Sequence, residues 1–138
     1  MTQPRELILA NIRLEQANQC LASAIKLLEF GDSRGAVNRA YYAIFHGMRS
    51  VLVLQSKDFA KHSAVISYFR REYVKPGIFS TDLSDTITTL FNTRSSSDYS
   101  DTWELTDEDV KALIEEAKNF IEAITKYHEN NIGNNTNP

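Results

Sequence analysis

Residues 33–54 read SRGAVNRAYYAIFHGMRSVLVL, and this stretch decides the fold of the chain. Its large apolar residues return at alternating steps of four and three, at Val37, Tyr41, Ile44, Met48 and Val51. That spacing is typical of a helix whose apolar seam packs inside a bundle. We therefore predict an amphipathic helix of about 22 residues here, packed against other helices.

Four further segments show helical periodicity, at residues 5–30, 62–74, 81–93 and 107–128. In the first, the expected core positions are Leu7, Ile8, Ile12, Leu14, Ala17, Leu21, Ala24, Ile25 and Leu28. Gly31 is expected to end the first helix and Pro76-Gly77 the helix at 62–74. Asp32 or Ser33 is expected to cap the start of the helix at 33–54, and a capping box over Thr106–Asp109 the start of the helix at 107–128. Residues 95–105 lack a period and predict a loop. The fold class expected is all-α, an up-and-down antiparallel bundle of about five helices.

The length of 138 residues fits one domain, placed at residues 1–130, with a disordered Asn-rich tail at 131–138. The net charge of −3 argues against a strongly basic, non-specific binder of nucleic acid or of membrane surfaces. The single cysteine, Cys20, excludes an internal disulfide and fits a reducing compartment. No apolar run approaches the ~20 residues of a membrane span, and the first residues lack a signal-peptide pattern. We expect a cytoplasmic protein that does not contact a membrane.

A polar line runs along the helix predicted at 33–54. Arg39 and His46 are seven residues apart, so they lie within about 20° of each other on a helix, and Ala43 and Ser50 follow the same line. The line points away from the apolar seam. Small residues flank it, at Ala36, Ala40, Ala43 and Gly47. A solvated helix face is the simplest interpretation, but the small flanks and the aromatic Tyr42 also suit close approach by a ligand or a second copy.

An arginine and a histidine in this arrangement can cleave RNA. A histidine near its ordinary pKa of ~6.5 can take the proton of the 2′-hydroxyl or protonate the leaving 5′-oxygen. The arginine fork can hold the phosphate and stabilise charge as it develops. No cluster of metal ligands accompanies the pair in the sequence, so we expect a metal-independent reaction without a cofactor.

The segment Asn38-Arg-Ala-Tyr-Tyr-Ala-Ile-Phe-His46 resembles the signature helix of the HEPN domain family, in its small prokaryotic branch. Three other segments are similar to that family: Lys61-His62-Ser63, the stretch FRREYV at 69–74, and RSSSDY at 94–99. The resemblance extends from the first helix to about Tyr127.

The resemblance implies a helical bundle and a homodimer formed across the motif-bearing helices. It also implies an Arg-x(4–6)-His motif, used by family ribonucleases of which many are toxins held in check by a nucleotidyltransferase antitoxin. Arg39 and His46 match its long form as catalytic residues, with Asn38 and Tyr42 placed to position RNA.

Two departures keep other functions open. Ala40 stands where active family members often have a polar residue after the arginine. Met48 stands where one toxin branch carries a tyrosine that the partner nucleotidyltransferase modifies, so that regulation does not carry over. The family also includes non-catalytic members, which implies an alternative: a nucleotide-binding module or a partner subunit of a nucleotidyltransferase. A purely structural helical dimer is the third alternative.

Two further residues are candidates for substrate binding. His62 is either a second polar group near the groove or a helix-end histidine bonded to a neighbour. Arg94 lies at an RNA or nucleotide cleft, or else pairs with Asp98 beneath Tyr99 in a structural cluster.

Outside these candidates, residues 57–75 carry a local charge of +3, which predicts either a phosphate-tracking patch or a solvated face. Trp103 is expected to anchor its loop on the bundle.

Overall fold

Helix α2 (Ser33–Leu52) lies at the centre of the fold. The structure is a computed structural model that describes residues 4–99 and 103–136. Side chains are described in these ranges except at 97–99 and 132–136. The other elements are α1 (Pro4–Glu29), a 3₁₀ turn η1 (Val53–Gln55), α3 (His62–Phe69), a π-helical turn η2 (Arg70–Val74), α4 (Thr81–Tyr99) and α5 (Asp107–Thr136). The described ranges contain five α-helices and no strand, which confirms the all-α class.

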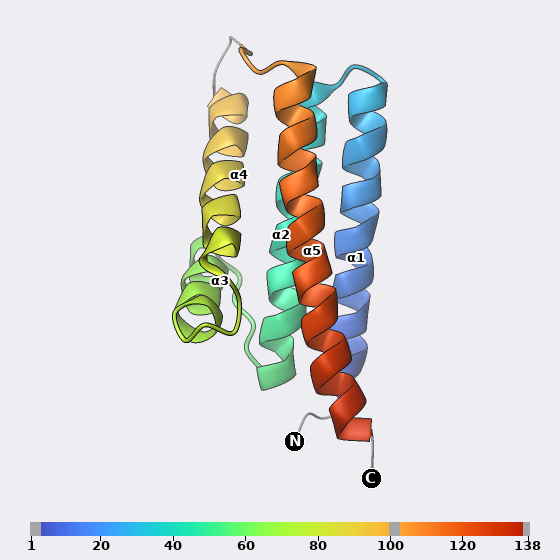
Figure 1. The fold of residues 1–138 in the computed structure, drawn as a ribbon, viewed down its shortest axis with the longest axis vertical. Coiled ribbons are helices and arrows are strands. Elements are labelled where there is room, and N and C mark those ends of the chain that lie inside the picture. The colour runs from blue at the N-terminus through green and yellow to red at the C-terminus, as the bar shows by residue number, and fades with distance from the viewer. Residues whose placement is uncertain (1–3, 100–102, 137–138) are drawn as a thin grey trace.

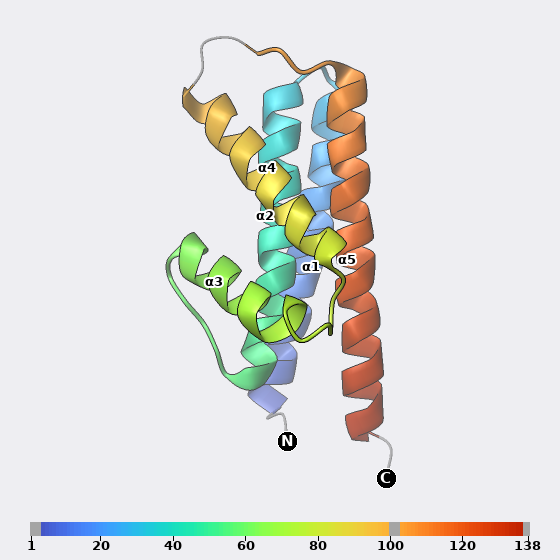
Figure 2. The same cartoon turned by 60° about the vertical axis from the view of Figure 1, so that its left-hand side comes forward.

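Three long helices run side by side and two others cover one flank. Helices α1, α2 and α5 share the long axis of the molecule, with α2 antiparallel to α1 and α5 parallel to α2 (Figure 1). Helix α4 packs against α2 at a tilt, and α3 crosses the lower part of α2 obliquely (Figure 2). The chain thus encloses α2 between α1, α5 and the α3–α4 pair.

Alanines allow α1 and α2 to pack closely, and this pair makes the most extensive helix contact in the fold. Ala10, Ala17 and Ala24 recur every seven residues on α1 and are fully buried. On α2 the facing small residues Ala36 and Ala40 are fully buried too. Side chains of this size let two backbones approach, and an alanine loses no rotamer freedom on burial.

The small residues of α2 therefore serve the bundle itself. Ala43 is fully buried, and a Cβ added to Gly47 would meet Ile121 Cδ1 at 3.0 Å and Ile124 Cγ1 at 3.5 Å. The absence of a side chain at Gly47 lets α5 lie against α2. The interpretation of these flanking positions as free surface for a ligand or second copy is wrong, because α1 and α5 already cover them.

The predicted seam of α2 is confirmed, whereas part of the predicted core of α1 is wrong. Val37, Tyr41, Ile44, Met48 and Val51 are each fully buried. By contrast, the α1 side chains of Ile8, Ile12 and Ile25 are 61%, 46% and 43% exposed. The alanines decide which face of α1 turns inward, so these isoleucines lie on the outer side.

The predicted helix ends agree with the local hydrogen bonds. Asp32 accepts a hydrogen bond from the Gly35 amide at 2.9 Å and caps α2, directly after Gly31 at φ +87°. Thr106 and Asp109 form the reciprocal capping box of α5, with bonds of 3.0 and 3.1 Å between side chains and amides. Such caps satisfy amides that have no partner within the helix.

Two helices are longer than the periodicity predicts. The loop predicted at residues 95–105 is present at 103–105 but wrong for 95–99, where α4 continues to Tyr99. The threonines of α4, including Thr89 and Thr93, donate to carbonyls one turn back rather than breaking the helix. Helix α5 continues beyond the predicted end at 128, to Thr136. Residues 137–138 of the expected tail lie outside the described residues. No helix in the described part is long and apolar enough to cross a membrane.

A buried polar pair joins α2 to α5 below the seam. Ser50 is fully buried, and its hydroxyl donates to the Gly47 carbonyl at 2.6 Å and lies 2.9 Å from His128 Nε2. Since that hydroxyl proton is already used, His128 donates through Nε2–H. Burial lowers the pKa of His128 to about 4, so the imidazole is neutral in the fold.

We expect the stability of the protein to fall as pH drops from about 6.5 to 4. The folded pKa of His128 lies below its ordinary value of ~6.5, so the unfolded chain binds the proton more readily in this range. The stabilisation is complete above pH ~6.5, and this residue alone loses on the order of 2–3 kcal/mol by pH 4. Chemical denaturation from pH 8 to 4 measures it. His128→Gln, which keeps an amide donor for Ser50, should flatten the curve; an unchanged acid slope would contradict the assignment.

Candidate active site

The accessible edge of α2 is a row of half-buried polar residues. Its members follow one another at steps of one, three or four and are Asn38, Arg39, Tyr42, His46 and Arg49. We call this row the α2 edge. Arg39 and His46 share it as predicted, but Ala43 and Ser50 do not, because both are fully buried against the bundle. The edge is therefore centred on Tyr42.

Arg39 is held by weak neutral partners. Its Nη2 donates to Asn38 Oδ1 at 3.5 Å, its Nη1 lies 3.9 Å from Cys20 Sγ, and its guanidinium lies 5.3 Å from the centre of the Tyr42 ring. Among the described residues Arg39 has no carboxylate partner. The guanidinium thus keeps an uncompensated charge and can bind an anion.

His46 lies two turns beyond Arg39 on the α2 edge, with its ring 6.2 Å from that of Tyr42 and 6.0 Å from that of Phe45. Its Nδ1 is buried and finds no hydrogen-bond partner in the described part of the chain, so the accessible side of the ring carries Nε2. Burial lowers the pKa of His46, and the charges of Arg49, Arg39, Arg13 and His62 lower it further. The imidazole is neutral at pH 7 and able to accept a proton.

Arg94 reaches the α2 edge from α4. Its Nη2 donates to the Tyr42 hydroxyl at 3.3 Å, and its guanidinium lies 5.1 Å from the Tyr41 ring centre and 5.3 Å from that of Tyr42. The ring of Tyr42 therefore lies near two guanidiniums, those of Arg39 and Arg94. The side chains of Asp98 and Tyr99 lie outside the described residues, so their expected cluster with Arg94 stays a prediction.

His62, the first residue of α3, joins the same cluster. Its ring stacks on Phe45 with 4.0 Å between the ring centres, and its Nδ1 lies 2.9 Å from the hydroxyl of Tyr41. Burial, Arg94 and Arg49 lower the pKa of His62, and burial raises that of Tyr41 to about 12. Both groups are neutral at pH 7. His62 thus bonds to a neighbour at the helix end, and its ring centre also lies 5.7 Å from that of Tyr42 on the α2 edge.

Sequence reasoning missed an ion cluster beside His46. Asp58, in the loop before α3, accepts from Arg13 Nη2 at 2.8 Å and from Arg49 Nη2 at 3.1 Å. Burial raises the pKa of Asp58, but the bonds from both arginines outweigh it and leave the pKa lowered. Arg13 lies on the buried face of α1 with 9% of its surface exposed. A charged side chain at a buried position needs a partner of opposite charge. The position of Arg13 on the buried face of α1 was therefore the sequence signal for this ion cluster.

The remaining basic residues of the segment 57–75 differ in their contacts. Arg70 turns toward Ser84 and Thr88 of α4, and Arg71 pairs with Glu72 at 3.1 Å. Lys57, Lys61 and Lys75 are exposed. Residues 57–75 thus carry three exposed lysines and two arginines that bond to neighbouring side chains, and a phosphate-tracking patch or a solvated face stays a prediction. As expected, Trp103 packs on the core, with the Arg34 guanidinium 5.4 Å from its ring centre.

The chemistry of the whole cluster favours an anionic ligand. Three helices supply four guanidiniums, Arg13 from α1, Arg39 and Arg49 from α2 and Arg94 from α4, and their charges act on two neutral imidazoles, those of His46 on α2 and His62 on α3. The guanidiniums of such a site can bind a phosphate group, and an imidazole can transfer a proton to or from an oxygen next to it. Within the described residues, no three His, Cys, Asp or Glu side chains converge as metal ligands would.

The protein is a small helical bundle whose central helix carries an arginine and a histidine on its accessible edge. Comparison with known proteins identifies the family to which this bundle belongs. The HEPN domain family matches residues 10–128, so the chain belongs to that family. The chain is 37% identical over 111 residues to a "UPF0332 protein" of Thermotoga maritima, covering 80% of this chain and 84% of that protein.

Two archaeal relatives carry a functional name. The chain is 36% identical over 122 residues to "Putative toxin MJ0605" of Methanocaldococcus jannaschii, covering 88% of this chain and 89% of that protein. It is 29% identical over 116 residues to "Putative toxin MJ0142" of the same organism, covering 83% and 78% of the two chains.

Replacing Asp58 should change both the unfolding free energy of the protein and the pKa of His46. Asp58→Asn leaves Arg13 without a counter-charge, so we expect a loss of about 1–2 kcal/mol in unfolding free energy. It also removes the carboxylate that pairs with Arg13 and Arg49, two charges that lower the pKa of His46, so that pKa should fall further. Histidine NMR titration and chemical denaturation measure the two effects.

Glu72→Gln is the matched control for Asp58→Asn, because Glu72 pairs with Arg71 on an exposed surface. It should leave both measurements unchanged within error. An Asp58→Asn protein with unaltered stability and an unaltered His46 titration would show that the ion cluster is not coupled to the α2 edge.

Proposed function

We propose that this protein is a toxin of the endoribonuclease type that cleaves RNA without a metal ion, with Arg39 and His46 as its catalytic residues. One observation carries the proposal: a neutral, half-buried imidazole lies on an accessible helix edge among guanidiniums, and one of them, that of Arg39, has no carboxylate partner in the described chain. The names of the archaeal relatives support a toxin.

His46 acts as the general base in the proposed reaction. Its Nε2 takes the proton of a 2′-hydroxyl, and the freed oxygen bonds to the adjacent phosphorus. The bond from phosphorus to the 5′-oxygen then breaks, giving a 2′,3′-cyclic phosphate and a 5′-oxygen that takes a proton from a second, protonated imidazole. Arg39 binds the phosphate and stabilises the extra charge on its oxygens in the transition state.

A homodimer across the α2 edges would supply the second imidazole. Each chain offers one His46 on its edge, and a two-fold axis would bring two Arg39–His46 pairs together. The bound phosphate raises the pKa of the imidazole that acts as the acid, because a nearby negative charge favours the protonated form. A nucleotidyltransferase antitoxin is the partner proposed to restrain this activity in the cytoplasm.

The other polar groups of the cluster position the substrate. Tyr42 presents a ring and a hydroxyl between two guanidiniums, which suits a base or ribose beside the bound phosphate. Asn38 holds the Arg39 fork. Arg94 and His62, from α4 and α3, extend the binding surface away from α2.

Purified protein should cleave total RNA in EDTA, and Arg39→Ala and His46→Ala should each lower the rate at least about 100-fold. Arg71→Ala, at an exposed arginine paired with Glu72, is the matched control and should cleave like the wild type. Gel analysis of end groups should detect the cyclic phosphate. Circular dichroism and sedimentation check that fold and assembly are retained.

A well-folded wild type that leaves RNA intact, or equal cleavage by all four proteins, would contradict the ribonuclease proposal. Tight binding of a nucleotide or of a nucleotidyltransferase by that inactive protein would then identify a non-catalytic module.

The dependence of kcat/KM on pH should report His46 in the free enzyme. Because the folded pKa of His46 lies below the ordinary ~6.5, its proton-accepting form persists below that pH. The acidic limb of the profile should therefore have its midpoint below 6.5, with the rate falling as pH drops through it. A midpoint clearly above 6.5 would show that another group is the base.

A further inference from the structure

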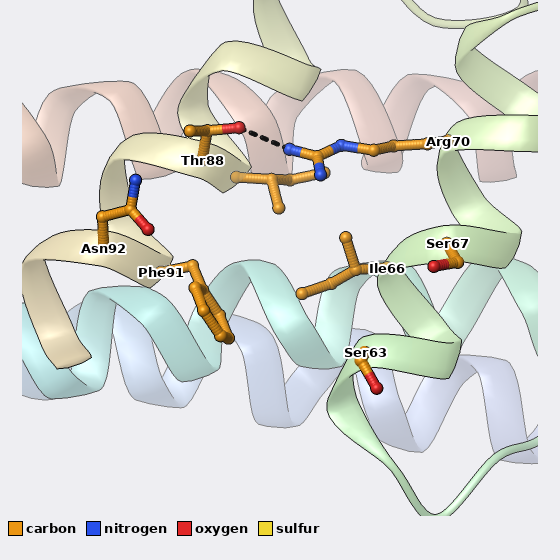
Figure 3. A pocket seen from close by; sticks show the side chains of 8 residues that line it. Ser63, Ile66, Ser67, Arg70, Thr88, Phe91 and Asn92 are labelled. Carbon is orange, nitrogen blue, oxygen red and sulfur yellow. Dashed lines mark hydrogen bonds between the residues drawn. The ribbon is translucent and has the colours of Figure 1, made fainter.

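A pocket of about 270 Å³ opens between α3, η2 and α4, on the flank of the bundle (Figure 3). Ile66 of α3 and Phe91 of α4 face each other across it, and Ile87 contributes to its apolar lining. Phe91 is 36% exposed although it is a large apolar side chain. The pocket thus has two apolar walls with open space between them.

The rim of this pocket is polar and carries a positive charge without a counter-charge. Arg70 reaches across to α4, where its Nε donates to Ser84 Oγ at 2.9 Å and its Nη2 to Thr88 Oγ1 at 2.6 Å. Figure 3 shows the bond to Thr88. These acceptors are neutral, and no carboxylate of the described chain pairs with Arg70. Ser63 and Asn92 add hydroxyl and amide groups to the same rim.

The pocket lies next to the cluster of side chains around Tyr42. The ring of Phe91 lies 6.0 Å from that of Tyr41, whose hydroxyl is 2.9 Å from His62 Nδ1. His62 directly precedes Ser63 on one wall, and Arg94 follows Phe91 by three residues on the other. Both walls of the pocket therefore also contribute a residue to the cluster around Tyr42.

The dimensions and chemistry fit a nucleobase. A base has two flat apolar faces, which suit the space between Ile66 and Phe91, and a polar edge, which suits Arg70 and Asn92. The volume lies at or just below the low end of small-molecule sites, roughly 300–1,000 Å³, so it suits one heterocycle rather than a dinucleotide. Proteins that bind single-stranded RNA commonly stack unpaired bases on aromatic side chains.

We propose that this pocket is a base-binding subsite for an unpaired nucleotide of the RNA whose backbone lies along the α2 edge. Phe91 stacks on the base, Arg70 and Asn92 bond to its edge, and Arg94 contacts the chain between pocket and edge. The inference rests on the proposed function, since it takes the ligand of the α2 edge to be RNA.

The test is a binding experiment that does not depend on cleavage. Fluorescence anisotropy measures the Kd of a labelled adenylate oligomer of about ten nucleotides in the His46→Ala background. Adding Phe91→Ala should weaken binding about tenfold, whereas Phe91→Trp should retain it. Phe30→Ala, at an aromatic that is 85% exposed in the loop between α1 and α2, is the matched control and should have no effect. Thermal melting confirms that each variant folds.

A set of oligomers with one base removed locates the pocket on the RNA. At one position, loss of the base should weaken binding as much as Phe91→Ala does, and combining the two should weaken it no further. Equal additive effects at every position, or no effect of Phe91→Ala, or no binding of RNA at all, would overturn the subsite.

The outcome separates the two proposals. RNA cleaved in a His46-dependent way but bound independently of Phe91 would overturn the subsite and leave the ribonuclease standing. RNA bound through Phe91 by a wild-type protein that does not cleave it would support the subsite and contradict the catalytic role of His46.

Discussion

Close packing of small residues around α2 is the constraint on which the rest of the structure depends. The alanines of α1 and α2 bring those two helices together, and Gly47 admits the side chains of α5. Helices α3 and α4 cover a third side of α2 (Figure 2). Beyond the first turn of α2, only the narrow row from Asn38 to Arg49 is then left half-buried. A helix enclosed in this way holds its remaining polar side chains in fixed positions.

The electrostatics of the site follow from that enclosure. Half-burial lowers the pKa of His46, and the neighbouring arginines reinforce the effect, so a neutral imidazole lies among positive charges. Asp58 compensates Arg13 and Arg49 but not Arg39. An anion is the natural complement of such a site, and binding one would in turn raise the pKa of His46. Anion binding and the protonation of His46 are thereby linked within a single cluster of side chains.

Sequence periodicity predicted the elements whose determinants are local. The seam of α2, the cap at Asp32 and the capping box at Thr106 depend on residues within a turn or two of each other, and all three are present. The loop prediction is wrong for residues 95–99 because side-chain bonding and packing on α2 favour a helix of modest intrinsic propensity. The inward face of α1 was missed because alanine spacing outweighs the larger isoleucines.

The candidate site was predictable only in part for the same reason. Arg39, Tyr42 and His46 share a helix edge, so their spacing alone brings them together. Asp58 joins Arg13 across 45 positions and Arg49 across nine, and neither contact leaves a local pattern. Arg94 and His62 reach Tyr42 and Tyr41 from other helices, and the helical periodicity predicted neither contact. Contacts of this kind depend on how the helices pack.

The most direct test of the account is an NMR map of the complex with RNA whose 2′-hydroxyls are methylated and therefore cannot be cleaved. The account predicts that amide shifts concentrate on the α2 edge from Asn38 to Arg49 and continue onto α4 near Arg94, and that the pKa of His46 rises in the complex. Shifts concentrated on the outer faces of α1 and α5, with an unaltered His46 titration, would contradict it.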